Sequence, residues 1–172
     1  MIGEKMAGAL NTQLNREMYS AYLYMAMSAY STSIGLEGFA NWFMVQYYEE
    51  MVHAMKFYDY INGQGSRVKL MAIEQPPADF AGPLDTFEKT LKHEKLVTSL
   101  IHKLAGLART EKDQATGTFL QWFVKEQVEE EENAHDLVAK LKKIGDNKDA
   151  LLTLDKELAA RVFTPPDQSA ER

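Results

Sequence analysis

Residues 125–132 read Lys125-Glu126-Gln127-Val128-Glu129-Glu130-Glu131-Glu132 and place five glutamates in the middle of a long helical pattern. Taking every third or fourth residue, an apolar stripe runs through the same segment. The stripe comprises Leu120, Phe123, Gln127, Glu130, Ala134, Leu137, Leu141 and Ile144. Gln127 and Glu130 lie within it, so part of the acidic run faces a core. A buried carboxylate is unfavourable unless it is protonated, paired or bound to a metal, so the sequence predicts a group that compensates this charge.

The composition is that of a soluble globular protein, and it limits the possible functions. With 172 residues, 45% of them hydrophobic and 26% charged, the chain is expected to form one domain with a sizeable core. The net charge of −6 argues against a nucleic-acid-binding surface, which requires a basic patch, and is compatible with attracting cations. The absence of cysteine excludes disulfides, thiolate metal sites and cysteine nucleophiles.

No membrane segment is expected. The N-terminus lacks a basic stretch followed by an apolar one, so no signal peptide is predicted and the expected location is the cytoplasm. Residues 18–36 carry no charge, but serines and tyrosines interrupt them, which favours a helix buried on most sides by protein. Residues 38–48 are also uncharged and rich in aromatics. Two such helices have more apolar surface than one bundle core can bury, and this predicts a homo-oligomer.

Five helices are predicted. They cover residues 3–33, 39–62, 84–110, 114–144 and 148–161. The first two are joined by a short glycine-bearing turn and are therefore antiparallel neighbours. Between the second and third, glycines and prolines end the helical pattern, and an extended-looking run covers residues 67–73. A connection of this length can travel along a whole bundle.

The predicted fold class is therefore all-α: a four-helix bundle with one long crossover plus a short fifth C-terminal helix. Residues 1–161 form the single domain, and residues 162–172 form a polar C-terminal tail.

Each of the four long helices interrupts its apolar stripe near its midpoint with an acidic residue. These residues are Glu17, Glu50, Glu94 and Glu130, and His53 lies three residues after Glu50 on the same helix face. A tilted helix explains one such acid, but one acid per helix at matching depth indicates a cluster. Four carboxylates in a dry core require compensation, and two divalent cations would neutralise them.

The ligand types favour iron or manganese, with zinc as a competitor. Bundle cores that hold two metals through glutamates and Glu-x-x-His pairs are typical of di-iron proteins. Here Glu50 and His53 supply one such pair, whereas the fourth helix offers Gln127 in place of a second. One metal is then expected on Glu17, Glu50 and His53, and the other on Glu94, Glu130 and a shared Glu50. This asymmetry predicts that the second metal binds more loosely. Loose binding suits iron that passes through the site better than it suits a permanently bound cofactor.

These residues resemble those of the non-haem bacterial-type ferritins over essentially the whole chain. The matching motifs are Asn15-Arg16-Glu17 through Tyr24, Glu49-Glu50-Met51-Val52-His53, His93-Glu94, residues 119–131 and Leu154-Asp155-Lys156-Glu157-Leu158. The resemblance implies an iron-storage protein: a hollow shell of twenty-four subunits that acts as a ferroxidase. It would oxidise Fe(II) with O2 or hydrogen peroxide and keep the product inside as a ferric mineral.

The resemblance also implies roles for individual residues. The ferroxidase centre is matched by Glu17, Glu50, His53, Glu94, Gln127 and Glu130, and an additional third iron site by Glu49, Glu126 and Glu129. Tyr24 and Trp122 match aromatic positions beside the centre. The resemblance implies that these two residues act as auxiliary electron donors; plain core packing is the alternative. The acidic lining of the three-fold channel found in animal ferritins has no match near Gly117 and Leu120, so no uptake pore is assigned.

Other functions compete with storage. A di-iron oxidase or peroxidase acting on another substrate would share the metal ligands but would need no shell. A haem-containing bacterioferritin is suggested only by Met51, and no haem is expected because the fourth-helix Glu-x-x-His is missing. A metal-free structural bundle would keep the core acids protonated. A DNA-protecting mini-ferritin is disfavoured by the fifth helix. His93, His102 and His135 lack ligand partners and are predicted at the surface or an interface.

Overall fold

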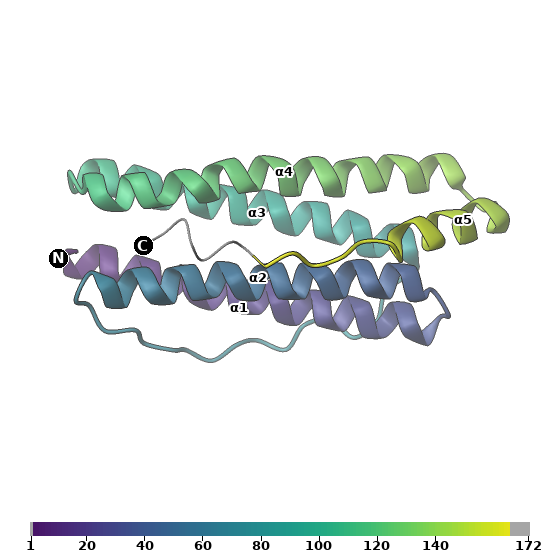
Figure 1. Cartoon of the computed structure of the whole chain (residues 1–172), viewed down its shortest axis with the longest axis horizontal. Coiled ribbons are helices and arrows are strands. Elements are labelled where there is room, and N and C mark those ends of the chain that lie inside the picture. Colours follow the sequence, from purple (N-terminus) through teal and green to yellow (C-terminus); the bar gives the residue numbers. More distant parts are fainter. Residues whose placement is uncertain (1, 166–172) are drawn as a thin grey trace.

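The computed structural model describes residues 2–165, which form five α-helices and no β-strand (Figure 1). The helices are α1 (Glu4–Ser33), α2 (Glu37–Gly63), α3 (Pro83–Thr110), α4 (Gln114–Ile144) and α5 (Lys148–Leu158). The predicted all-α fold class is confirmed. Helix α2 begins two residues earlier than predicted, and α5 ends three residues sooner. Of the predicted polar tail, residues 162–165 are non-helical, while residues 166–172 lie outside the described range.

The turns follow from local chemistry. Gly35, between α1 and α2, has a φ of 77°, a left-handed conformation that glycine adopts without steric cost. Asp113 caps α4: its side chain accepts from the Thr116 backbone N–H at 3.0 Å. Asn147 caps α5 in the same way by accepting from the Ala150 N–H at 3.1 Å. These short connections make α1 antiparallel to α2 and α3 antiparallel to α4.

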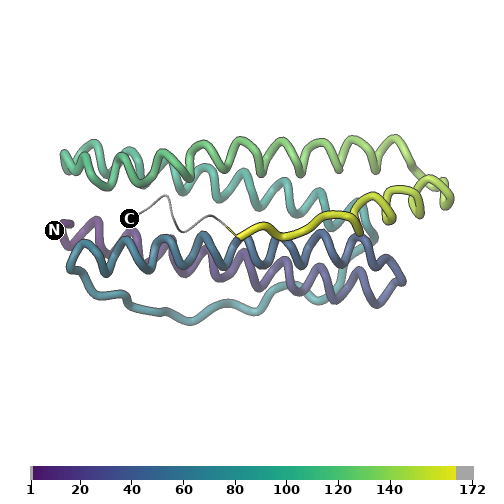
Figure 2. Tube along the Cα trace, viewed as in Figure 1, coloured from purple at the N-terminus to yellow at the C-terminus, as the bar shows by residue number. Residues whose placement is uncertain are grey.

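The connection from α2 to α3 is the predicted long crossover. Figure 2 shows it running along the outside of the bundle from one end to the other, so that α2 and α3 point the same way. Two side chains of α1 hold it: Asn11 donates to the Arg67 carbonyl at 3.3 Å, and Asn15 donates to the Ala72 carbonyl at 3.2 Å. The run over 67–73 is extended but pairs with no strand in the described part of the chain.

The core divides into two apolar clusters with a polar layer between them. Towards α5, one cluster packs Tyr24, Phe39, Trp42, Phe43, Phe87, Leu137 and Leu154. Towards the other end, the second packs Met6, Leu10, Phe57, Ile61, Ile101, Leu120 and Phe123. On every long helix the buried acids lie between the residues of the two clusters. The dry clusters therefore seal the polar layer from both ends.

Helix α5 closes one end of the bundle. Leu154 and Leu158 are buried against the first cluster, and the Phe39 backbone N–H donates to Asp155 Oδ1 at 3.0 Å. Gly38 makes this contact possible, because a Cβ there would lie 1.6 Å from the Asp155 carbonyl oxygen. After α5 the chain turns back along α2 (Figures 1 and 2). Among the described residues, no helix has the length and hydropathy needed to cross a membrane.

Candidate metal centre

The polar layer contains one acidic residue from each long helix and one histidine. Glu17, Glu50, Glu94 and Glu130 are 0–5% exposed, and His53 is 3% exposed. Their helical positions explain this burial, because each lies on the apolar stripe of its own helix. All five side chains are thus buried in the core, as their place on the apolar stripes predicts.

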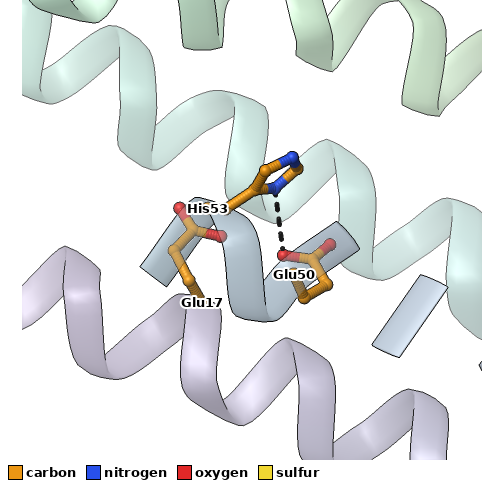
Figure 3. A group of neighbouring side chains, drawn as sticks. All are labelled: Glu17, Glu50 and His53. Atoms are coloured by element: carbon orange, nitrogen blue, oxygen red, sulfur yellow. Dashed lines mark ion pairs between the residues drawn. The ribbon is translucent and has the colours of Figure 1, made fainter. Parts of the chain in front are cut away.

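A first ligand group joins α1 to α2. One donor atom each from Glu17, Glu50 and His53 lie within 4.8 Å of one another (Figure 3). Glu50 Oε2 lies 3.3 Å from His53 Nδ1, and Gln13 donates to Glu17 Oε1 at 2.8 Å. The other oxygen of Glu17 and Oε2 of Glu50 are buried without a hydrogen bond. Two unsatisfied carboxylate oxygens beside an imidazole nitrogen are a donor set that fits a divalent cation.

A second ligand group joins α2 to α4. Donor atoms of His53, Glu126 and Glu130 also lie within 4.8 Å of one another. His53 faces this group with Nε2, which lies 4.0 Å from Glu126 Oε1. Oε2 of Glu130 accepts a hydrogen bond from the Gln46 side chain at 2.9 Å. His53 thus belongs to both groups and links them.

This grouping differs from the expected division of ligands. Glu94 was expected to share a metal with Glu50 and Glu130, but it lies in neither group among the described residues. Its carboxylate is instead held by two side chains: the Tyr24 hydroxyl donates to Oε1, and Gln127 donates to Oε2 at 3.1 Å. In the metal-free chain Gln127 therefore contacts the Glu94 carboxylate, and whether Gln127 also binds a metal, as predicted, stays a prediction.

Burial raises the pKa of all four core glutamates. It raises the pKa of Glu17 from 4.5 to about 8, with the Glu50 charge as the second cause. The pKa of Glu130 rises to about 8 through burial and then the charge of Glu94, and that of Glu50 rises well above its usual range for the same reasons. The pKa of Glu94 is also raised, chiefly by burial. The metal-free layer therefore holds protons at neutral pH, and a cation would replace them.

The residues expected in the third site are less closely gathered. Glu126 is half-buried and belongs to the second group, whereas Glu129 is exposed and lies in neither group. Glu49 is half-buried, and its Oε2 lies 2.7 Å from Nη2 of Arg161. Arg161 was not predicted from the sequence, because it is 112 residues away and no helical period links it to Glu49. The sequence analysis also did not predict that Gln13 and Gln46 donate hydrogen bonds to core glutamates. Their spacing could have indicated it, because each lies four residues before a core glutamate on the same helix face.

Two aromatic residues border the layer. Tyr24 is fully buried, and burial followed by the Glu94 charge raises its pKa well above the usual value, so its hydroxyl keeps its proton. Trp122 is 38% exposed, and its ring centroid lies 5.3 Å from that of His53 in an edge-on arrangement. Tyr24 thus has a specific polar contact in addition to core packing, while Trp122 reaches from the solvent to His53.

Among the other histidines, His102 and His135 are exposed, as predicted. His93 is half-buried, which differs from a surface position. Its Nε2 lies 2.7 Å from the Ser20 hydroxyl, and burial lowers its pKa to about 4. The reason is packing: its ring also contacts those of Tyr19 and Tyr24.

A family model described as a ferritin-like domain matches residues 7–144, which span all of the ligands described above. The chain belongs to the ferritin family. This ferritin is 43% identical over 163 residues to a bacterial non-heme ferritin of Staphylococcus aureus, covering 95% of this chain and 98% of the relative. The resemblance to ferritins predicted from the sequence is confirmed.

Solved structures of archaeal ferritins are also similar to this ferritin. A form of the Archaeoglobus fulgidus ferritin engineered to be closed is 55% identical, with a TM-score of 0.95, covering 95% of this chain and all of that one. The open-pore ferritin of the same organism is 55% identical, with a TM-score of 0.94 over 94% of this chain and 100% of that chain. A humanized archaeal ferritin is 53% identical, with a TM-score of 0.95 over 96% and 100%.

Proposed function

We propose that this ferritin stores iron by oxidising Fe(II) in the polar layer and keeping the ferric product as a mineral inside an oligomeric shell. The observation that carries this proposal is the pair of ligand groups that share His53, with buried oxygens of Glu17 and Glu50 left without hydrogen bonds. Two cations bound there would satisfy these oxygens and neutralise the core carboxylates. Membership in the ferritin family supports iron as the cation.

Each residue of the layer has a proposed role in binding the substrate. Glu17, Glu50 and His53 hold one Fe(II) ion, and the second is held by Glu130 with Glu94 and Glu126. Glu50 lies between the two ions, and Gln127 steadies Glu94 until the metal arrives. Two Fe(II) ions would then supply two electrons, which together with two protons reduce O2 to hydrogen peroxide or hydrogen peroxide to water.

Proton release accompanies this binding. Because the pKa values of Glu17 and Glu130 are raised to about 8, both carboxyls are protonated near neutral pH and must lose their protons to bind iron. Tyr24 keeps its hydroxyl proton and positions Glu94 through its hydrogen bond. We also assign Tyr24 the role of an auxiliary electron donor, because no other phenol is hydrogen-bonded to a ligand carboxylate among the described residues. When a single Fe(II) ion meets hydrogen peroxide, the Tyr24 phenol would supply the second electron together with its hydroxyl proton, and water would form.

The proposed third iron site comprises Glu49, Glu126 and Glu129, beside the second ligand group on α2 and α4. Glu126 links the two, because it faces His53 and is also half-open to solvent. Iron leaving the centre would meet these carboxylates next. This explains why the acidic run continues beyond the residues that face the core.

We further propose that residues 1–161 act as one ferritin-like domain and that twenty-four copies form the shell, in the cytoplasm. Several large apolar side chains are exposed on the single chain, among them Tyr22, Tyr48, Met55, Leu70, Met71 and Leu96. Burial of such residues between subunits supports assembly. Binding of haem or nucleic acid is not part of the proposal.

The test is an anaerobic Fe(II) titration of the metal-free protein, followed by addition of O2 at a large excess of iron. The wild type should oxidise the first ions rapidly and then form soluble mineral in a particle of several hundred kilodaltons. Glu50→Ala should lose the rapid phase and keep the particle, because Glu50 is only 1% exposed on the single chain and so offers almost no surface to a neighbouring subunit. Glu74→Ala removes an exposed carboxylate of the crossover and should behave as wild type.

Rapid oxidation at the wild-type rate in Glu50→Ala would contradict the assignment. If two ions bind but the excess iron is not turned over, and sedimentation gives a monomer or dimer, the protein is instead a di-iron oxidase or peroxidase.

A further inference from the structure

The chain that follows α5 returns to the polar layer. Residues 159–165, here called the C-terminal segment, run back along α2 towards the middle of the bundle (Figures 1 and 2). Asn41 fixes the start of this segment by donating to the Arg161 carbonyl at 2.9 Å. Further along, the Phe163 ring centroid lies 5.4 Å from that of Tyr48. The segment is therefore attached to the face of α2 that also bears Glu49.

Arg161 makes three contacts with α2. Its Nη2 donates to Glu49 Oε2 at 2.7 Å, its Nη1 donates to the Trp42 carbonyl at 3.3 Å, and its guanidinium lies 4.7 Å from the Trp42 ring centroid. Both partners of the ion pair are mostly shielded, with side-chain exposures of 23% for Arg161 and 29% for Glu49. A charge-assisted hydrogen bond in such a setting is stronger than a surface ion pair.

The same segment covers the approach to the second ligand group. A cavity of about 120 Å³ lies there, and its lining includes Glu49, His53, Trp122, Glu126, Phe163 and Thr164. Glu49 borders this cavity but is not among the residues whose donor atoms lie within 4.8 Å of one another. Its carboxylate is turned to Arg161 instead.

We propose that Arg161 is an internal cation that occupies Glu49 until a metal ion displaces it, and that the C-terminal segment loosens when this happens. The inference rests on the proposed third iron site. Arg161 offsets the negative charge of Glu49 while no metal is bound. A metal ion bound to Glu49 would neutralise its charge and use the oxygen lone pairs that now accept from Arg161. The guanidinium and the metal ion therefore compete for the same carboxylate. Arg161 is thus a positioning residue that weakens the third site.

The test uses Zn(II), which has no redox chemistry, and isothermal titration of the metal-free shell. In Arg161→Gln the third Zn(II) per subunit should bind about tenfold more tightly than in wild type, because the metal no longer breaks a charge-assisted hydrogen bond. The first two Zn(II) ions should bind as before. Arg161→Lys retains a positive charge without the fork geometry and should give an intermediate value.

Two controls isolate the contact. In a Glu49→Gln background, Arg161→Gln should leave Zn(II) binding unchanged, because the contested carboxylate is gone. Lys142→Gln makes the same change in net charge at a distant ion pair, where Lys142 lies 2.9 Å from Glu88, and should have no effect. In the wild type, the third equivalent of Zn(II) should also accelerate deuterium uptake in the C-terminal segment. The Arg161 N–H donates to the Leu158 carbonyl at 3.2 Å in the docked segment, and we expect this bond to open more often once the segment loosens.

Unchanged binding of the third Zn(II) in Arg161→Gln would overturn the inference. Weaker binding would overturn it too, since Arg161 would then hold Glu49 in place for the metal. If Arg161→Gln melts at a much lower temperature than wild type, Arg161→Lys replaces it in the test. Unchanged or weaker binding of the third Zn(II) in Arg161→Lys would then overturn the inference. Failure of the proposed function is distinct: the first two Zn(II) ions would then not bind, or would bind equally well to Glu50→Ala.

Discussion

Raising the pH of the metal-free protein from about 6 to about 7.5 should destabilise it, because carboxyls of the polar layer are protonated only in the fold. The pKa values of Glu17 and Glu130 rise from 4.5 to about 8, first through burial and then through a neighbouring carboxylate. A group whose pKa is higher in the folded state stabilises the fold fully below its unfolded pKa. That stabilisation is lost as the pH rises through the folded pKa, so here it declines between 4.5 and about 8.

The magnitude follows from proton linkage. Within this window each carboxyl loses about 1.4 kcal/mol of stabilisation per pH unit, so the two together lose about 3 kcal/mol per unit. From pH 6 to 7.5 these two carboxyls alone should therefore lower the free energy of unfolding by about 4 kcal/mol. For a chain of this length, that loss lowers the melting temperature by about 10 °C.

The assay is thermal melting followed by circular dichroism, with a chelator present and at one protein concentration. Glu17→Gln keeps the shape of the side chain but removes its titration, so its free energy of unfolding should depend on pH less steeply, by about 1.4 kcal/mol per unit. Glu74→Gln, at an exposed position, should retain the wild-type slope. With Zn(II) bound the sign should reverse, because protons then compete with the metal. A melting temperature that is flat or rises in the chelator series, or a Glu17→Gln slope equal to wild type, would refute the reasoning.

Three further changes test the packing. Gly38→Ala should detach α5, since the new Cβ would lie 1.6 Å from the Asp155 carbonyl oxygen; helix content and proteolysis after residue 145 report this, and an intact α5 would count against the docking described. Phe43→Ala removes a fully buried ring that stacks 4.9 Å from Phe87, and it should cost about 3–5 kcal/mol of unfolding free energy in denaturant melts. Asp113→Ala removes the cap of α4 and should cost about 1 kcal/mol in the same melts, whereas Asp113→Asn should cost less.

Much of the fold could be predicted from the sequence because helices bury a periodic face. The stripes through Glu17, Glu50, Glu94 and Glu130 place these residues at one depth once four helices lie side by side, and the structure agrees. The long crossover was predicted from its glycines and prolines, which exclude helix. Boundaries were predicted less well: α5 ends at Leu158 rather than at 161. Beyond Leu158 the local hydrogen bonds shorten to a three-residue spacing, as from the Arg161 N–H to the Leu158 carbonyl, and Asn41 of α2 holds the chain by donating to the Arg161 carbonyl.

The burial of the four core glutamates and His53 was predicted, but the pairing of their side chains was not. His53 links two ligand groups, and Glu94 is held by Tyr24 and Gln127 instead of lying beside Glu50. Residues on one helix face can be recognised from their spacing, but the direction of each carboxylate depends on the side chains opposite it. Those side chains come from other helices, and no spacing along the chain describes them.

The sequence by itself determined the helices, the family and the layer of acids in the core, because each depends on local period or on motif identity. Only the tertiary structure decided which cation faces which carboxylate. Arg161 reaches Glu49 because α5 folds over the end of the bundle and sends the chain back along α2. That contact joins residues far apart in sequence through the docking of a whole helix, and such a docking arises from packing in three dimensions.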